Sequence, residues 1–494
     1  MAREMILVLD FGGNQAQLAA RMIRNAKVYC QVMPADTPLG VIKEKAPAGI
    51  VCVGDSKIDI QDSGIAFNSD IFALCVPILA MGSACRALCL AVGGRLDGVV
   101  LNNAIRTLNL PETTLFEGVG GAMRRFARAD RMILPKGFSV LSAVDGAVLA
   151  MTNDALKCTG VQFAPETNDI DSQHLLSNFA LHVCRCSPKW TMRVFLEDTI
   201  SQIREKVGSK KAFMLLSGGI DTSVCAMLMH RAIGDRLHCV FIDNGVLRIN
   251  EADDVDRLFN DILGVKIQRV DAGERFMTAL SGIASPERKR AVFNQMTLNV
   301  LKEELEKVNE PCFAVKGTIY TDVLERTPST TVDKLTGFEG VIEPLAELFK
   351  DEVRALGEML GIPSNVVYRQ PFPQMGLIKR CVGEVNQEKI DILGKADSIV
   401  RQEIESAGVL RGTYQCFAVI SDTKTTCIVD DLVASGYMIA GRAVNIVEQN
   451  HAVAARLPYE LIERIVERIT KEIPGVSRVV YDMTGKPSAT VEWE

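Results

Sequence analysis

The sequence predicts an α/β protein with two doubly wound parallel-sheet domains followed by a smaller α+β domain. Short apolar strands alternate with helical stretches along most of the chain, and this alternation breaks near Cys186–Trp190 and again near Arg369–Pro373. Strands that are apolar over their whole length are typical of parallel sheets with helices on both faces. The two breaks predict domains at residues 1–187, 188–369 and 370–494.

The first segment contains the clearest strands. Met5–Asp10 is expected to be a buried strand, and a helix is expected from Gln15 to about Asn25. Further strands are expected at Ile50–Val53, Val76–Met81 and Gly160–Phe163. This series predicts a parallel sheet between two layers of helices.

The second segment repeats the alternation, and the third changes it. Strands are expected at Lys211–Leu216, Leu237–Asp243 and Val265–Val270, with a helix at Ser223–Ala232. A strand, a glycine-rich turn and a helix in this order are typical of phosphate binding. A long helical run over residues 385–407, followed by short strands, indicates an α+β third segment.

The bulk composition excludes several classes of function. A hydrophobic content of 48% and a charged content of 23% are ordinary for a globular protein. The net charge of −6 argues against nucleic acid as a partner. The 14 cysteines form no CxxC pair, which predicts a reducing cytoplasm and no zinc site. Residues 1–10 are unlike a signal peptide, and Pro77, Gly82 and Arg86 interrupt the apolar stretch 74–94, so no membrane segment is expected.

One loop carries the strongest chemical signal. Ser217–Ser223 has the sequence SGGIDTS and lies between an expected strand and an expected helix. Two glycines let the backbone approach an anion, the hydroxyl groups supply donors, and the helix N-terminus favours negative charge. Asp221 is a candidate Mg²⁺ ligand, because Mg²⁺ binds one or two carboxylates together with substrate phosphates. A bare Gly-Gly is more often only a tight turn, but the complete heptad is more specific, and it lacks the Walker pattern.

The heptad resembles the PP-loop, SGGxDS, of the N-type ATP pyrophosphatases. That family cleaves ATP between the α- and β-phosphates, transfers the adenylyl group to a carbonyl oxygen, and lets a nitrogen nucleophile displace AMP. Seven further stretches resemble the GMP synthetase family: Phe241–Arg248, Gly317–Glu325, Glu343–Leu345, Leu348–Arg354, Arg369–Pro373, Leu457–Tyr459 and Lys486–Glu494. The resemblance covers essentially the whole chain and implies ATP and Mg²⁺ as cofactors.

The resemblance also implies a set of site residues. Asp221 and Lys350 are expected to be catalytic, with Asp221 on Mg²⁺ and Lys350 beside the ATP phosphates. The expected ATP-binding residues are Ser217, Gly218, Gly219, Ile220, Asp221, Thr222, Ser223, Ile242 and Gly317. The residues expected to bind the acceptor nucleotide are Arg248, Asp322, Lys486 and Glu492. Taken alone, Lys350 and Lys486 are more typical of solvated surface lysines.

The first domain has a likeness of its own, carried by Asp10–Gly12, Gln17–Leu18 and Val161–Phe163. It resembles a class I glutamine amidotransferase, whose nucleophilic Cys lies on a sharp turn and is completed by a later His and Glu. Gly82 stands where the family has the Cys, Ala164 stands where it has the His, and Glu166 is retained. Cys85 lies about three residues beyond the turn without a His base, so it is not expected to substitute. Glutamine hydrolysis is therefore not expected.

Four departures from the family lie closer to the synthetase site. The lid interval Arg326–Ile342 is short and lacks the family's His-His pair. Gln374–Leu377 replaces the family's GPGL, and Ser421–Asp431 lies where the family has an Arg-containing strand and MGDGR turn. Lys316 replaces a glutamine before the GTIY stretch and adds a charge near the expected nucleotide site. These departures leave the identity of the acceptor open.

The resulting hypothesis is an ATP-dependent amidoligase. It would adenylate XMP, or a related nucleotide, and aminate it with ammonia to give GMP, AMP and pyrophosphate. The ammonia would come from solution or from a separate partner, and the C-terminal domain implies a homodimer. Two alternatives stay open: a PP-loop paralog with a different substrate, and a nucleotide-binding regulatory pseudoenzyme.

Overall fold

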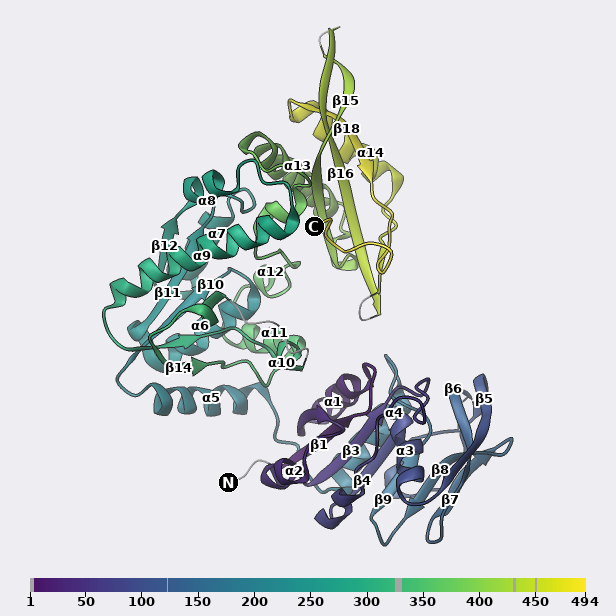
Figure 1. Ribbon diagram of the computed structural model, residues 1–494. Helices are drawn as coiled ribbons and strands as arrows, with labels where there is room; N and C mark the ends of the chain where they lie inside the picture. The colour runs from purple at the N-terminus through teal and green to yellow at the C-terminus, as the bar shows by residue number, and fades with distance from the viewer. Residues whose placement is uncertain (1–3, 122, 325–330, 430–431, 449–450) are drawn as a thin grey trace. The chain divides into compact units, whose positions relative to one another are not determined.

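The computed structural model describes residues 4–121, 123–324, 331–429, 432–448 and 451–494 (Figure 1). Contacts divide the chain into two compact units, Met1–Phe195 (unit 1) and Leu196–Glu494 (unit 2), and helix α5 (Met192–Val207) spans the boundary. The predicted α/β fold, with parallel sheets and a smaller α+β part at the C-terminal end, is confirmed. The domain limits near residues 187 and 369 stay predictions.

Unit 1 is built on a sheet whose central strands are parallel. Its described residues form seven strands in the order β2-β1-β3-β4-β9-β8-β7. The parallel strands are β1 (Met5–Asp10), β2 (Tyr29–Pro34), β3 (Gly49–Gly54), β4 (Ile78–Gly82) and β9 (Cys158–Val161). The antiparallel strands β8 (Ala147–Asn153) and β7 (Ser139–Val144) extend it at one edge. The helices of this unit include α1 (Gln15–Asn25), α2 (Leu39–Lys45), α3 (Ser83–Ala91) and α4 (Ile170–Asn178).

Unit 1 also holds a two-stranded antiparallel ribbon, β5 (Arg95–Thr107) and β6 (Met123–Ile133). Most side chains of β5 are exposed or half-buried, so its sequence has no continuous apolar run. The search for strands with continuous apolar runs therefore did not predict this ribbon.

Unit 2 begins with a parallel sheet in the order β12-β11-β10-β13-β14 within its described residues. The strands are β10 (Lys211–Leu216), β11 (Leu237–Asp243), β12 (Ile267–Asp271), β13 (Cys312–Val315) and β14 (Phe338–Ile342). The helices that accompany it are α6 (Ile220–Ile233), α7 (Glu251–Asp256), α8 (Gly273–Leu280), α9 (Pro286–Val308), α10 (Tyr320–Leu324), α11 (Lys350–Met359) and α12 (Ser364–Val367). The strand order reverses between β10 and β13, and ligands of such sheets bind outside the carboxyl ends of the strands at that point.

The rest of unit 2 is a small sheet flanked by two helices, α13 (Gln387–Ser406) and α14 (Tyr459–Glu472). The long strands β15 (Gln415–Val429) and β16 (Leu432–Glu448) are antiparallel, and β17 (His451–Ala454) and β18 (Val476–Tyr481) both pair with β16. Helix α14 places Leu461, Ile465 and Ile469 four residues apart on its buried face, as a helix with one apolar side requires.

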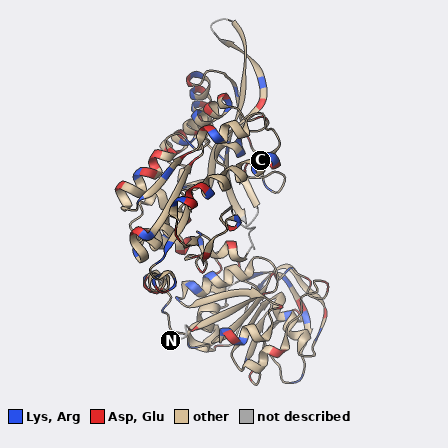
Figure 2. Cartoon of the chain, turned by 60° about the vertical axis from the view of Figure 1, so that its left-hand side comes forward, with Lys and Arg blue, Asp and Glu red and all other residues tan. Residues whose placement is uncertain are grey.

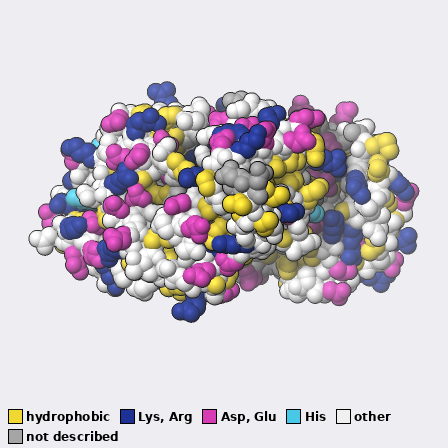
Figure 3. Space-filling view, turned by 90° about the horizontal axis from the view of Figure 1, so that it is seen from above, with side chains coloured by type: hydrophobic (Ala, Val, Ile, Leu, Met, Phe, Trp, Pro, Cys, Tyr) yellow, Lys and Arg dark blue, Asp and Glu magenta, His cyan; other side chains and the backbone are white. Residues whose placement is uncertain are grey.

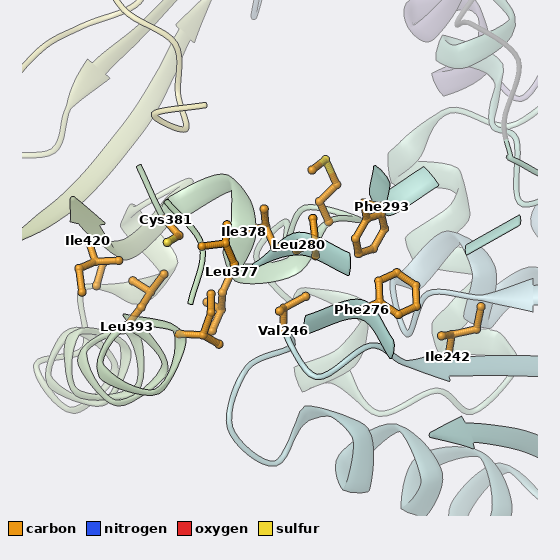
Figure 4. Packing of buried hydrophobic residues seen from close by; sticks show 14 of the residues in the cluster. Ile242, Val246, Phe276, Leu280, Phe293, Leu377, Ile378, Cys381, Leu393 and Ile420 are labelled. Carbon is orange, nitrogen blue, oxygen red and sulfur yellow. The ribbon is translucent and has the colours of Figure 1, made fainter. Parts of the chain in front are cut away.

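One hydrophobic core joins the two parts of unit 2. It extends from Ile242 and Phe276 beside the parallel sheet, through Leu377, to Leu393 on α13 and Ile420 on β15 (Figure 4). Contacts therefore do not separate residues 196–369 from residues 370–494, although the sequence pattern changes between them.

A buried ion pair also ties the C-terminal residues to α9. The Lys289 ammonium is completely buried and donates to Glu494 Oε2 at 2.6 Å and to the Cys381 carbonyl at 2.6 Å. A buried lysine is tolerated when a carboxylate balances its charge.

Glu494→Ala is expected to lower the free energy of unfolding by about 3–5 kcal/mol, because it leaves the Lys289 ammonium buried without a counter-charge. Urea unfolding of the full chain measures the change. Glu303→Ala is the matched control: it removes the exposed pair with Arg275 and is expected to cost about 1 kcal/mol at most. Equal losses in the two variants would contradict the prediction.

Acidic and basic residues are interspersed along the helices and strands of both units (Figure 2). This distribution, with a net charge of −6, does not favour a long polyanion as ligand. None of the helices in the described ranges is long and apolar enough to cross a membrane.

Candidate active site

The SGGIDTS loop lies where β10 ends and α6 begins, at the reversal of strand order. Gly218 has φ +74°, and a Cβ atom there would lie 2.7 Å from a methyl group of Val255, so the position requires glycine. Gly219 is the N-cap of α6 and gives the helix no side-chain cap. The first backbone N–H groups of α6 therefore remain available to an anion.

Hydroxyl groups hold the shape of the loop. Ser217 Oγ lies 3.0 Å from Thr222 Oγ1, and the Gly219 amide donates to Ser217 Oγ at 3.3 Å. Thr222 and the buried Ser223 each donate a hydroxyl hydrogen bond to the Gly219 carbonyl, at 3.1 and 2.9 Å. These bonds order the loop before any ligand arrives.

Asp221 and Lys350 meet beside the loop. Lys350 Nζ lies 2.7 and 2.6 Å from the two carboxylate oxygens of Asp221, and about a third of each side chain is exposed. Partial exposure leaves both groups accessible to a phosphate or a cation. Within the described residues no group of three His, Cys, Asp or Glu side chains could hold a metal by itself. A Mg²⁺ ion carried by phosphates needs only one or two carboxylates, and Asp221 fits that requirement.

A cavity of about 280 Å³, the loop cavity, opens beside these groups. Residues 217–221, Ile242 and Lys350 line it, together with the aromatic rings of Phe276 and Phe293. The cavity thus has the loop and Lys350 on one side and two aromatic rings on the other. This arrangement suits a ligand with phosphates at one end and an aromatic ring at the other.

A larger cavity of about 760 Å³, the arginine cavity, adjoins the loop cavity. Gly218, Arg354, Arg369, Gln370 and Pro371 line both cavities. The described arginines of its lining are Arg248, Arg257, Arg354, Arg369 and Arg401. Asp254 and Glu405 also line it, Arg257 pairs with Asp254, and Arg369 pairs with Glu251. Guanidinium groups bind phosphate and carboxylate oxygens with defined geometry, so these arginines are candidates to bind an anionic second ligand.

The remaining predicted residues are distributed differently. Gly317 packs on the loop, where a Cβ atom would lie 3.3 Å from the Thr222 amide. Glu492 accepts hydrogen bonds from Arg380 and Gln415. The Asp322 carboxylate accepts the Ile319 amide, and Lys486 exchanges backbone hydrogen bonds with Ala452. Neither cavity, as lined by the described residues, includes Asp322, Lys486 or Glu492, so the roles of these three residues stay predictions.

Four residues that line these cavities were not among the site residues predicted from the sequence: Arg354, Arg369, Phe276 and Phe293. Arg354 and Arg369 lie within stretches that match the family, and Arg354 follows Lys350 by one helical turn. Phe276 and Phe293 gave no such signal, because apolar helix residues usually belong to a core.

Lys316 adds less free charge than its sequence position suggests. Its ammonium pairs with Asp333 and lies 3.9 Å from a Glu343 carboxylate oxygen. Within the predicted lid interval, residues 326–330 lie outside the described residues. The part that is described forms a short helix at Thr331–Lys334 and strand β14.

The turn of unit 1 where the glutaminase family has its nucleophile lies between tightly packed neighbours. Gly82 has φ +64° and ψ −127° between β4 and α3, a conformation that glycine adopts without strain. A Cβ atom at this position would lie 2.9 Å from the Ala164 Cβ and only 2.2 Å from the Gly54 carbonyl oxygen. Glu166 is exposed, and burial raises the pKa of the fully buried Cys85 thiol above its ordinary value. Positions 82 and 164 are therefore neighbours, as the Cys and His of a catalytic triad are. The Gly54 carbonyl oxygen, however, lies where a side chain at position 82 would have to begin.

Residues 7–183 match the family model described as glutamine amidotransferase class-I, and residues 402–493 match that described as GMP synthase C terminal domain. The protein named GMP synthase (glutamine-hydrolyzing) of Clostridium tetani is 37% identical over 510 residues and covers 100% of both chains. The protein of the same name from Halothermothrix orenii is 39% identical over 511 residues, again with 100% of both chains covered. The solved structure of an NH₃-dependent NAD synthetase from Campylobacter jejuni is 18% identical, with a TM-score of 0.31, and the match covers 45% of this chain and 88% of that one.

Proposed function

The chain belongs to the GMP synthase family, and we propose that it is an ammonia-dependent ligase. It adenylates XMP with ATP and aminates the adenylate to give GMP, AMP and pyrophosphate. It does not hydrolyse glutamine. ATP and Mg²⁺ are the proposed cofactors.

One observation carries the proposal: the SGGIDTS loop, with Asp221 and Lys350, opens on a cavity that adjoins a second cavity rich in arginine. Two anionic substrates that react with each other need two adjoining sites of this kind. Proximity and fixed charges supply most of the rate in such reactions, so a site without an acid–base pair is sufficient.

In the proposed first step, the C2 oxygen of XMP attacks the α-phosphorus of ATP, and the bond to the β-phosphate oxygen breaks. The first N–H groups of α6 and the Lys350 ammonium donate hydrogen bonds to the leaving pyrophosphate and stabilise its negative charge. Asp221 would hold Mg²⁺, which neutralises phosphate charge when bound. In the second step, ammonia attacks C2, AMP leaves with the bonding electron pair, and protons pass to solvent.

The proposed loss of glutaminase activity rests on the packing around Gly82. A glutaminase of this class needs a thiolate and a base within hydrogen-bond reach. Gly82 and Ala164 supply neither, and the Gly54 carbonyl closes the position. Ammonia would come from solution or from a separate partner protein.

We also propose that the protein is a cytoplasmic homodimer joined through the C-terminal part, and that residues 1–187, 188–369 and 370–494 are its domains. The ribbon of β15 and β16 exposes Ile428, Leu432 and Val433, each at least 71% accessible. Hydrophobic side chains gather on the surface around this ribbon in the view from above (Figure 3). Exposed apolar patches of this kind mark protein interfaces.

The decisive experiment mixes the purified chain with ATP, Mg²⁺, XMP and ammonium, and resolves the nucleotides by chromatography. GMP, AMP and pyrophosphate are expected in equal amounts, and chelation of Mg²⁺ by EDTA is expected to abolish all three. Pyrophosphate release only with another nucleotide would assign a different acceptor. ATP binding without pyrophosphate release under any condition would favour a regulatory pseudoenzyme.

A further inference from the structure

Arg248, a lining residue of the arginine cavity, is held from behind by a buried carboxylate. Its side chain is 3% exposed, and its Nε donates to Asp397 Oδ2 at 3.3 Å. Its guanidinium lies over the Phe372 ring, 4.2 Å from the ring centre. Arg248 Nη2 is buried and makes no hydrogen bond to any described residue. A buried guanidinium nitrogen without a partner is an available donor.

Asp397 has a second set of contacts that fix its own position. Its Oδ1 accepts the Ala418 amide at 3.2 Å and Arg380 Nη1 at 3.0 Å. Arg380 is completely buried, and its other terminal nitrogen, Nη2, donates a hydrogen bond to Glu492 Oε1 at 3.3 Å. The carboxylate is thus held by α13, β15 and Arg380, so its Oδ2 presents a fixed acceptor to Arg248.

The charges make Asp397 central to this cluster. Burial lowers the pKa of Arg248 to about 10, and the Asp397 carboxylate opposes that effect. The positive charges of Arg380 and Arg401 also lower the pKa of Arg248. Without the carboxylate at position 397, two buried guanidinium groups would repel each other and turn apart.

We propose that Asp397 is a positioning residue for the acceptor nucleotide. It fixes the direction of the Arg248 guanidinium so that the unpartnered Nη2 meets an anionic oxygen of the purine nucleotide in the arginine cavity. This proposal rests on the proposed function, which places the acceptor nucleotide there, and it adds a residue that no sequence motif singled out.

The test measures XMP and ATP binding by calorimetry, and turnover with ammonium, in the full chain. Asp397→Asn is expected to weaken XMP binding and raise its KM about 10²-fold, since small misplacements of binding groups have effects of that size. The ATP Kd is expected to change less than about threefold. Asp391→Asn, an exposed position on the same helix α13, is the matched control and is expected to bind both nucleotides like the unchanged protein.

A double-variant cycle separates positioning from a merely structural role. Arg248→Met removes the binding group, and in that background Asp397→Asn is expected to cause no further loss of XMP affinity. The double variant also removes one of the two buried cations, so it remains measurable if Asp397→Asn alone does not fold. Equal loss in both backgrounds, or unchanged XMP affinity in Asp397→Asn, would overturn the proposal. If the unchanged protein binds no XMP, then XMP is not the acceptor, and the proposed role of Asp397 in XMP binding is refuted as well.

Discussion

Lys350→Ala protein is expected to release pyrophosphate from ATP and XMP about 10²- to 10³-fold more slowly than the unchanged protein. This is the cost of removing one preorganised charged donor from a site where negative charge develops. Lys350 is the described cation that lies closest to the loop carboxylate, with its ammonium against both oxygens of Asp221. The measurement is single-turnover formation of AMP with ammonium in excess.

The fold is expected to survive this substitution. The Asp221–Lys350 pair is partly exposed, and pairs of that kind contribute at most about 1 kcal/mol to stability. Lys302→Ala, which removes an exposed lysine of α9, is the matched control and is expected to keep full activity. A decrease of less than about tenfold in the rate of AMP formation by Lys350→Ala would contradict a catalytic role for Lys350.

Glutamine is expected to support no synthesis, with hydrolysis roughly 10⁶-fold below that of an intact catalytic triad. The double variant Gly82→Cys with Ala164→His is expected to remain without glutaminase activity. The new Cβ atom at position 82 would lie 2.2 Å from the Gly54 carbonyl oxygen, so the backbone of β3 must move before the side chain fits. The exposed Glu166 would also have to turn toward the new histidine.

Glutamate release from glutamine measures this activity directly, and ammonium-dependent synthesis by the same samples shows that each variant is folded. Glutamate formation by the unchanged chain at the rate of synthesis would contradict the assignment of Gly82 and Ala164. Glutamate formation by the double variant alone would show that the space around Gly54 opens more easily than its packing suggests.

Much of the fold followed from the sequence, because its central strands are apolar without interruption. Met5–Asp10, Lys211–Leu216 and Leu237–Asp243 form strands over the predicted residues. The ribbon of β5 and β6 was missed because its exposed side chains carry no periodic signal. The spacing of apolar residues in a sequence predicts strands that bury one or both faces. A ribbon with few buried side chains has too few apolar residues to show such spacing.

The site was predictable only where its residues are contiguous or lie in a recognisable stretch. The loop from Ser217 to Ser223 is one local motif, and its geometry depends on bonds among its own residues. The pairing of Asp221 with Lys350 joins positions 129 residues apart, and Asp397 reaches Arg248 across 149. Such contacts depend on tertiary packing, which no short pattern specifies.

The shared core of unit 2 also determines how this chain can be recombined with its relatives. The cluster that includes Ile242, Leu377 and Ile420 contains no residue of unit 1 among those described. An exchange just before α5, near residue 191, would leave this cluster in one piece, whereas an exchange near residue 369 would join two halves of one interior that had not changed together. Because this cluster draws no described residue from unit 1, changes at positions such as 82 and 164 leave its packing unaltered.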